Sequence, residues 1–188
     1  MKKVLLIVLI SCFVPILSMA QDYLSFGAGY TMMMQVDPEF KDVYTGIGFN
    51  IIAFKALGSL SFGTPGFYYN GSIFATKVTY VEGKNEFLGA QFQGGLGIRG
   101  RLSRFLLFLV GIGPQLNSLS IGDLKYGGPI LNYGVGATIE LSCSLTNVIH
   151  LSAGLQGGYM FAIPIDEESA FKGGIIISPS LSIGLGAL

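Results

Sequence analysis

The sequence is poor in the residues that metal sites and strongly charged surfaces require. Its 188 residues include one histidine, two cysteines and no tryptophan, and only 12% of the residues are charged. So few nitrogen and sulfur ligands argue against a zinc-type cluster, and we expect no metal and no cofactor. The acidic run Asp166–Glu168 could attract a cation, but a solvated loop is the simpler interpretation. Eleven basic and eleven acidic residues provide no field for nucleic acid, so no nucleic-acid partner is expected.

Long apolar runs are missing after the first twenty residues. The longest is Phe105–Val110, whereas a membrane-spanning helix needs about 18 apolar residues. Yet 51% of the residues are hydrophobic and the mean hydropathy is +0.61. An apolar chain without spanning helices can still insert into a lipid bilayer as a closed β-barrel, because a barrel pairs all of its backbone groups internally.

Residues 1–20 have the three parts of a secretory signal peptide. Lys2 and Lys3 form a basic start, and Val4–Ile10 forms an apolar segment. Ser18–Ala20 is a small-x-small cleavage site. We therefore expect cleavage before Gln21 and a single mature domain, residues 21–188.

Two other interpretations of this segment are weaker. An uncleaved membrane anchor needs a longer apolar run than this one, which Pro15 interrupts. A lipoprotein would be modified at Cys12, but Leu9–Cys12 matches the cleavage box loosely and lies too early. Once residues 1–20 are removed, Cys143 is the sole cysteine, so no intrachain disulfide is expected.

Apolar residues recur at every second position through most of the mature chain, which is the period of a β-strand. Six stretches show the pattern clearly, and they lie near 24–34, 47–53, 88–101, 131–143, 149–161 and 175–186. Phe105–Leu119 is also a predicted strand, with apolar residues on both faces at its start. An eighth stretch, Leu60–Thr76, is interrupted by Pro65 and Gly66, where we expect a bulge that shifts its phase. The sequence therefore predicts an all-β fold, an eight-stranded antiparallel up-and-down transmembrane β-barrel after an N-terminal signal peptide.

Charged residues are concentrated in four segments between these stretches. Fourteen of the twenty charges of residues 21–188 lie in Gln35–Val43, Lys77–Glu86, Leu119–Pro129 and Pro164–Gly173. The connections between them are short and lie near Lys55–Ser59, Leu102–Arg104 and Leu145–Asn147. Long polar loops at one end and tight turns at the other are the layout of outer-membrane barrels.

The polarity of the two faces predicts which one meets lipid. A secreted lipocalin-like barrel also has eight alternating strands, but its apolar face lies inside and its charged face meets water. In this chain the small and polar face has few charges, too few for a water-exposed surface. Its charged residues are Arg99, Arg101 and Glu140. On the apolar face we expect lipid contact at Leu131, Tyr133, Val135, Ala137 and Ile139.

Together these features resemble the small eight-stranded outer-membrane proteins such as the OmpA membrane domain, OmpX and OmpW. The resemblance spans residues 21–188 and rests on the signal peptide, strand number, alternation and loop rhythm rather than on a motif. It implies a monomeric barrel in a bacterial outer membrane, with membrane lipid around it. Such proteins usually end in an aromatic residue, commonly Phe, whereas this chain ends at Leu188.

The inward face supplies the candidate site residues. Arg99 or Arg101 is expected to form a buried ion pair with Glu140, because a carboxylate in a narrow lumen needs a cationic partner. The other polar residues expected in the lumen are Gln91, Gln93, His150, Ser152 and Gln156.

Glu140, His150 and Ser152 are also the residue types of an acyl-transfer triad. A hairpin that turns near Thr146 would put Glu140 opposite Ser152 and diagonal to His150. This group resembles the triad of the outer-membrane lipid A deacylase, but that triad faces lipid and this group would face the lumen. A polar plug is the simpler interpretation, so we expect no catalytic residues.

The width of an eight-stranded barrel limits its function. The interior is just wide enough for side chains, which argues against a general porin. We therefore predict a non-enzymatic scaffold whose loops serve adhesion, ligand contact or envelope maintenance, with a host or envelope ligand at the loops. The alternatives are a narrow channel for small solutes, a lipid-modifying enzyme and a secreted lipocalin-like binder.

Overall fold

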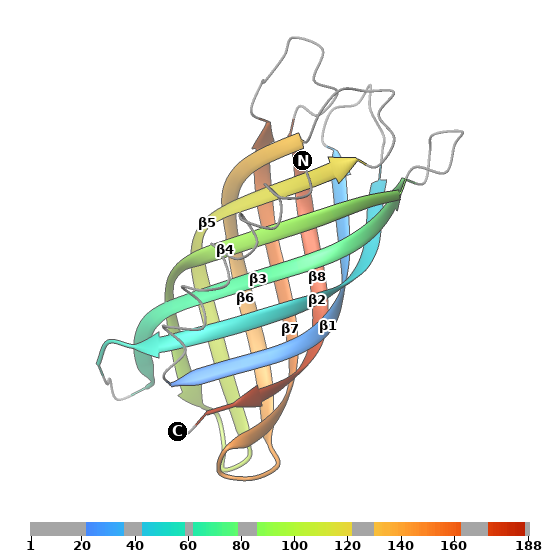
Figure 1. Ribbon diagram of the computed structural model, residues 1–188. Coiled ribbons are helices and arrows are strands. Elements are labelled where there is room, and N and C mark those ends of the chain that lie inside the picture. Colours follow the sequence, from blue (N-terminus) through green and yellow to red (C-terminus); the bar gives the residue numbers. More distant parts are fainter. Residues whose placement is uncertain are drawn as a thin grey trace.

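The computed structural model describes residues 22–35, 43–58, 62–78, 86–121, 130–162 and 173–186. Its strands form one closed antiparallel barrel, in which each strand pairs with the next in sequence and β8 closes against β1 (Figure 1). The strands are β1 (Tyr23–Gln35), β2 (Val43–Ala56), β3 (Thr64–Val78), β4 (Glu86–Arg101), β5 (Leu106–Ile121), β6 (Ile130–Ser144), β7 (Ile149–Ala162) and β8 (Gly173–Leu185). The predicted eight-stranded up-and-down fold is confirmed. Within the described ranges, no helix is long and apolar enough to cross a membrane.

Some predicted features lie outside the described residues. They are the signal peptide at residues 1–20, the acidic run Asp166–Glu168, Leu188 and the interior of each long charged segment. The ends of the strands nevertheless show that these four segments connect strands at one rim of the barrel (Figure 1). We call this the loop rim. The opposite rim, where the three short links lie, is the turn rim.

Two links at the turn rim are built in the same way. Residues 102–105 join β4 to β5, and residues 145–148 join β6 to β7. Ser103 Oγ and Thr146 Oγ1 each accept hydrogen bonds from the backbone N–H groups two and three residues later. Such hydroxyls satisfy backbone donors that a tight turn leaves open, and they favour the register of both hairpins.

Side chains alternate between the lumen and the outer face, as the period predicts. On β6, Val135 and Ile139 are exposed on the outside, whereas Thr138 and Glu140 are buried inside. Cys143 is a free thiol on the same outer face. The outer face is a belt of exposed apolar side chains, and the inner face is mainly polar side chains and glycine. This arrangement is the reverse of a lipocalin-like barrel, so that alternative is wrong.

The prediction for the third strand is wrong in its details. Its start is Thr64, and its pairing with β2 and β4 runs without a skipped residue, so there is no bulge at Pro65 and Gly66. Pro65 is tolerated because it is the second residue of the strand, where a missing ladder donor matters least. Even-numbered residues such as Tyr68 face the lumen. The interrupted sequence pattern could not show whether the even or the odd positions of this strand face inward.

Two other prolines interrupt the backbone pairing. The β1–β8 register skips two positions at Ser178 and Pro179, and the β4–β5 register skips two positions at Gly113 and Pro114. Proline has no N–H for the ladder. Each proline keeps its partner on the other neighbouring strand, so each break is confined to one side. One of the breaks therefore lies in the β1–β8 seam that closes the barrel.

Candidate functional site

The lumen near the turn rim is filled by a cluster of apolar side chains. Tyr23, Ile52, Phe54, Tyr68 and Leu109 are each at most 2% exposed and pack into one hydrophobic cluster, which we call the aromatic cluster. They come from β1, β2, β3 and β5, where each lies at an inward position of the alternation. Burying a side chain of this size contributes about 1.5–3 kcal/mol relative to leaving it in water. The cluster therefore stabilises the barrel while it fills this part of the lumen.

Three rings of the aromatic cluster lie against glycines of another strand, at positions where a Cβ atom would overlap the ring. The pairs are Tyr68 with Gly111, Tyr23 with Gly184 and Phe54 with Gly66. An interior of eight strands is just wide enough for side chains. A large ring fits there only where the residue that faces it is glycine and has no side chain. This pairing accounts for part of the high glycine content, 28 in 188 residues.

The contact between Tyr68 and Gly111 can be tested by Gly111→Ala. We expect a loss of about 1–3 kcal/mol in the free energy of unfolding, because the new methyl group overlaps the ring and forces a shift. Urea unfolding in detergent micelles measures it, followed by far-UV circular dichroism because the chain has no tryptophan. Gly157→Ala is the matched control, since its methyl would meet only Ile176 O at 3.8 Å and should change stability by less than about 0.5 kcal/mol. Equal losses in both variants would contradict the role of the ring.

Glu140 lies beside the aromatic cluster and is only 1% exposed. Its carboxyl group accepts hydrogen bonds from the Tyr23 hydroxyl, from Ser142 Oγ at 3.2 Å and from Ser25 Oγ at 3.3 Å. The Tyr23 hydroxyl is also 3.0 Å from Ser152 Oγ. A buried carboxyl group needs such partners, and here they come from β1 and β6, on opposite sides of the lumen.

Tyr23 also connects Glu140 with one of the two candidate arginines. The guanidinium carbon of Arg99 lies 4.1 Å from the centre of the Tyr23 ring, a cation–π contact. Arg99 is buried, whereas Arg101 is exposed at the end of β4. Arg99 is therefore the arginine that shares a contact residue with Glu140. The direct Arg99–Glu140 ion pair stays a prediction.

The hairpin of β6 and β7 is shifted by two residues from the predicted register. Glu140 pairs with Gly154, and Ser152 pairs with Ser142. The shift arises because the link occupies residues 145–148, so the hairpin turns one residue later than expected. Both Glu140 and Ser152 still face the lumen, since a shift of two residues keeps each side chain on its face.

His150 takes no part in a catalytic chain with the other two candidates. Its Nε2 donates to Gly186 O at 2.9 Å, and its Nδ1 lies 3.2 Å from Ser144 Oγ. Both ring nitrogens are thus engaged away from Ser152 and Glu140, whereas an activated nucleophile needs a base in contact with it. Among the described residues, no group of three His, Cys, Asp or Glu could hold a metal ion.

Toward the loop rim the lumen is filled by amides and hydroxyls. Gln93 Oε1 accepts hydrogen bonds from Thr138 Oγ1 at 2.8 Å and from Gln156 Nε2 at 3.0 Å. Gln156 Oε1 in turn accepts from Asn70 Nδ2 at 3.0 Å. The structure places Gln91 inside the barrel as well, also buried. These contacts connect side chains from β3, β4, β6 and β7 across the lumen.

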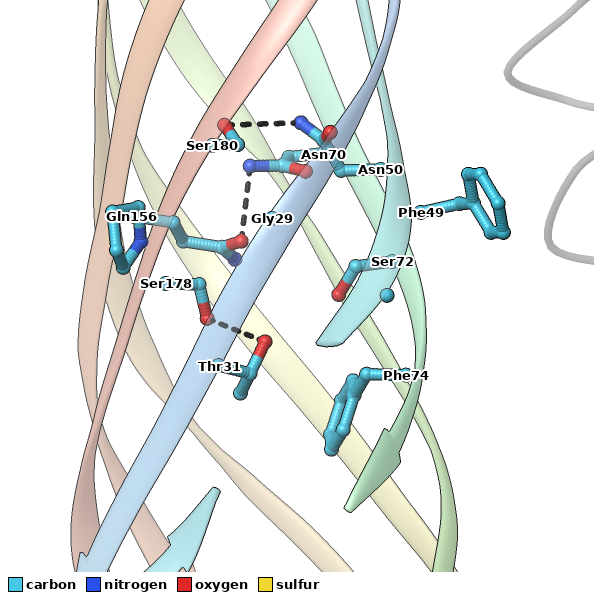
Figure 2. A pocket seen from close by; sticks show the side chains of 12 residues that line it. Gly29, Thr31, Phe49, Asn50, Asn70, Ser72, Phe74, Gln156, Ser178 and Ser180 are labelled. Carbon is cyan, nitrogen blue, oxygen red and sulfur yellow. Dashed lines mark hydrogen bonds between the residues drawn. The ribbon is translucent and has the colours of Figure 1, made fainter. Parts of the chain in front are cut away.

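A small cavity lies in this polar region, and Figure 2 shows the side chains around it. Its volume is about 10 Å³, room for roughly one water molecule. Asn50, Asn70, Ser72 and Gln156 are among its lining residues, and Phe49 points away from them toward the outside. A solute pathway would need far more space. In the described part of the chain, this region of the lumen is therefore filled rather than open.

Sequence reasoning missed three residues that organise the lumen. Tyr23 directly precedes the alternating residues 24–34 at an inward position, so the period itself contained this signal. Tyr68 and Asn70 lie on β3, whose phase could not be read from its interrupted pattern. Once the even positions of that strand are known to face inward, both follow.

No protein family model matches this sequence, and no curated protein matches it either. The fold does match solved structures. The crystal structure of Neisserial surface protein A (NspA) aligns with a TM-score of 0.63 and 15% identity, over 87% of this chain and 96% of that chain. Ail, the attachment invasion locus protein of Yersinia pestis, aligns with a TM-score of 0.54 and 10% identity, over 88% of this chain and 98% of that chain. The chain has the fold of the small outer-membrane β-barrels.

Two further solved structures align with this chain. Ail in complex with the heparin analogue sucrose octasulfate aligns with a TM-score of 0.55 and 9% identity, over 88% of this chain and 98% of that one. The outer-membrane enzyme PagL aligns more weakly, with a TM-score of 0.48 and 14% identity, over 86% of this chain and 97% of that one. The apolar outer face of the outer-membrane barrel fits the hydrocarbon of a bilayer. The fold and this outer face are those of a β-barrel that spans a bilayer.

Proposed function

We propose that this barrel is a non-enzymatic, monomeric scaffold that displays the segments of its loop rim at the cell surface. Their roles would be adhesion, ligand contact or envelope maintenance. The observation that carries the proposal is the filled lumen, whose polar region leaves a cavity of about 10 Å³ in the described part of the chain. The outer face is taken up by lipid. Partner contact is then left to the loop rim, since loops on a rigid scaffold commonly carry binding groups.

The charge of the loop-rim segments favours a basic partner. The four segments contain nine acidic and five basic residues, an excess of four negative charges. Complementary charge speeds encounter and disfavours wrong partners. A polyanion such as the heparin analogue in the Ail complex is therefore not the ligand expected here. We expect a host or envelope ligand with a basic surface.

Shortening Gln35–Val43 together with Pro164–Gly173 tests the display proposal, because these two segments contain the whole excess of negative charge. Cells that expose this variant are expected to bind a fluorescent decalysine peptide about tenfold less than cells with the full chain. Heat-modifiable gel migration should stay unchanged, since the strands are intact. Shortening Lys77–Glu86, which has two charges of each sign, is the matched control and should leave binding near its original level. Equal binding by all three proteins would contradict the proposal.

Planar-bilayer recording separates the display proposal from the narrow-channel alternative. Folded protein is expected to leave the bilayer silent, because amides and rings fill the lumen. Steady single-channel steps that change on Gln91→Ala or Gln156→Ala substitution would contradict the display proposal and favour the channel.

A further inference from the structure

The links at the turn rim expose large apolar side chains, whereas turns that meet water are mostly polar. Each of the three links has two such residues, and each of these side chains is between 52% and 66% exposed. They are Leu57 and Phe62 between β2 and β3, Leu102 and Phe105 between β4 and β5, and Leu145 and Val148 between β6 and β7. One exposed apolar residue needs no explanation, but two in every link of one rim indicate that this rim does not face water alone.

The apolar belt of the outer face continues into these links. At the turn-rim ends of β3, β5 and β7, the outward residues Phe67, Leu106 and Ile149 are apolar and exposed. At the loop-rim ends the outward positions become polar, as Thr45 on β2 and Ser118 on β5 show. The belt thus has a polar border at the loop rim, whereas at the turn rim it passes into the apolar links.

Strand β2 indicates how deep the turn rim lies in the bilayer. From Thr45 to Lys55 the outward residues between the two are all apolar. At about 3.3 Å per residue and a tilt of about 40°, this segment covers about 25 Å, the height of the apolar band of a transmembrane barrel. Lys55 therefore lies at the border of the hydrocarbon. Leu57, two residues farther along, falls within the headgroup layer, which is about 5–8 Å thick on each side.

The charges at the turn rim are mainly basic. Arg101 and Arg104 are exposed, and Lys55 is half-buried. The acidic residue among the described residues of this rim is Asp22, whose Oδ2 accepts a hydrogen bond from Ala56 N at 2.8 Å. The links themselves contain no acidic residue. This rim is therefore complementary to an anionic surface, in contrast to the acidic segments of the loop rim.

We propose that the turn rim is a binding surface for anionic phospholipids. The exposed apolar side chains of the links insert into the headgroup layer of the leaflet on this side. Lys55, Arg101 and Arg104 bind the phosphate groups of the same lipids. Long basic side chains suit this border, because their stems lie along apolar surface while their charged ends reach the headgroups. A soluble protein partner fits less well, since it would have to displace lipid from side chains that are continuous with the belt. This inference does not depend on the proposed display function.

Native mass spectrometry of the purified barrel tests the lipid preference. The protein in detergent micelles is mixed with equal amounts of phosphatidylglycerol and phosphatidylcholine that have the same acyl chains. We expect phosphatidylglycerol to bind preferentially. The triple variant Lys55→Gln/Arg101→Gln/Arg104→Gln should lose at least about tenfold in affinity for phosphatidylglycerol, because each basic residue near an anionic lipid surface contributes about fivefold. Its binding of phosphatidylcholine should stay near the wild-type level.

The matched control removes three basic residues from the loop-rim segments instead. Lys41→Gln/Lys77→Gln/Lys125→Gln changes the net charge by the same amount and should keep the preference for phosphatidylglycerol. Equal losses in the two triple variants would overturn the assignment to the turn rim. Equal binding of both lipids by folded wild-type protein would overturn the proposal as well, and this result needs no variant that folds.

Nuclear magnetic resonance of the ¹⁵N-labelled barrel tests the insertion of the links. The barrel is placed in lipid nanodiscs that contain both phosphatidylglycerol and phosphatidylcholine. A lipid with a nitroxide on its headgroup should broaden the backbone amide signals of Phe105 and Val148, whereas a water-soluble gadolinium chelate should leave them sharp. Strong broadening of both signals by the chelate, with little effect of the nitroxide lipid, would overturn the proposal. The turn rim would then face water and be free for a soluble partner.

Discussion

Glu140→Ala is expected to lower the free energy of unfolding by about 3–5 kcal/mol. The carboxyl group is buried and accepts hydrogen bonds from the hydroxyls of Tyr23, Ser142 and Ser25. The Arg99 guanidinium lies over the Tyr23 ring and stays in the lumen when the acid is removed. Removing one member of a buried charge pair leaves the other uncompensated. Equilibrium urea unfolding in detergent micelles, followed by circular dichroism, measures the loss.

Three further variants separate the ion pair from the hydroxyl contacts. Tyr23→Phe removes only the hydroxyl and should cost about 1–3 kcal/mol. Glu140→Gln keeps the size of the side chain and removes its charge, so it should fall between the wild type and Glu140→Ala. Combining Glu140→Ala with Arg99→Met should cost less than the sum of the single losses, because partners in contact are not additive. Strictly additive losses would contradict the predicted ion pair.

Val135→Arg is expected to destabilise the barrel by about 2–4 kcal/mol, the range for a basic residue at mid-membrane on the lipid face of a barrel. Val135 is 54% exposed on the outer face and lies in the middle of β6. Its paired neighbours are Pro114 on β5 and Tyr159 on β7. The new charge would therefore lie in hydrocarbon, far from both rims. The same unfolding assay measures the effect.

Val148→Arg introduces the same side chain at the turn rim. Val148 is also exposed on the barrel but lies in the link between β6 and β7, where water and lipid headgroups can solvate the charge. We expect a loss of no more than about 1 kcal/mol. The lipid-facing assignment of the outer face would be wrong if Val135→Arg lowered the free energy of unfolding as little as Val148→Arg does and the protein stayed soluble without detergent.

The fold could be predicted where the period of two is uninterrupted. On β6, small or polar residues alternate with apolar ones from Leu131 onward, so both the strand and its inward face follow from the sequence. The third strand shows where this reasoning fails. Pro65 and Gly66 suggested a bulge, but Gly66 is needed because the Lys55 carbonyl and the Phe54 ring of β2 both lie against it. The need for a residue without a side chain comes from the neighbouring strand, so the alternation of polar and apolar residues along β3 cannot reveal it.

The lumen residues could be predicted as a group, but their partners could not. The contact between Tyr23 and Glu140 joins strands that are 117 residues apart, and it depends on how the closed sheet brings β1 and β6 face to face. The register of the β6–β7 hairpin was missed for a related reason. A shift of two residues replaces Ser152 by Gly154 opposite Glu140, while every side chain stays on its face. The alternation of polar and apolar residues is the same in both registers, so it cannot distinguish them.

The pairing of rings with glycines makes the two faces of the barrel differ in how they tolerate evolutionary change. An outward residue such as Phe49 meets fluid lipid, so any apolar side chain can replace it and substitutions there can accumulate one at a time. In the lumen, a larger residue at Gly111 is accommodated only if Tyr68 becomes smaller in the same lineage. We therefore expect outer positions to vary singly and lumen positions to vary as coupled pairs. Two sequences can then differ at most positions and still fold into the same eight-stranded barrel.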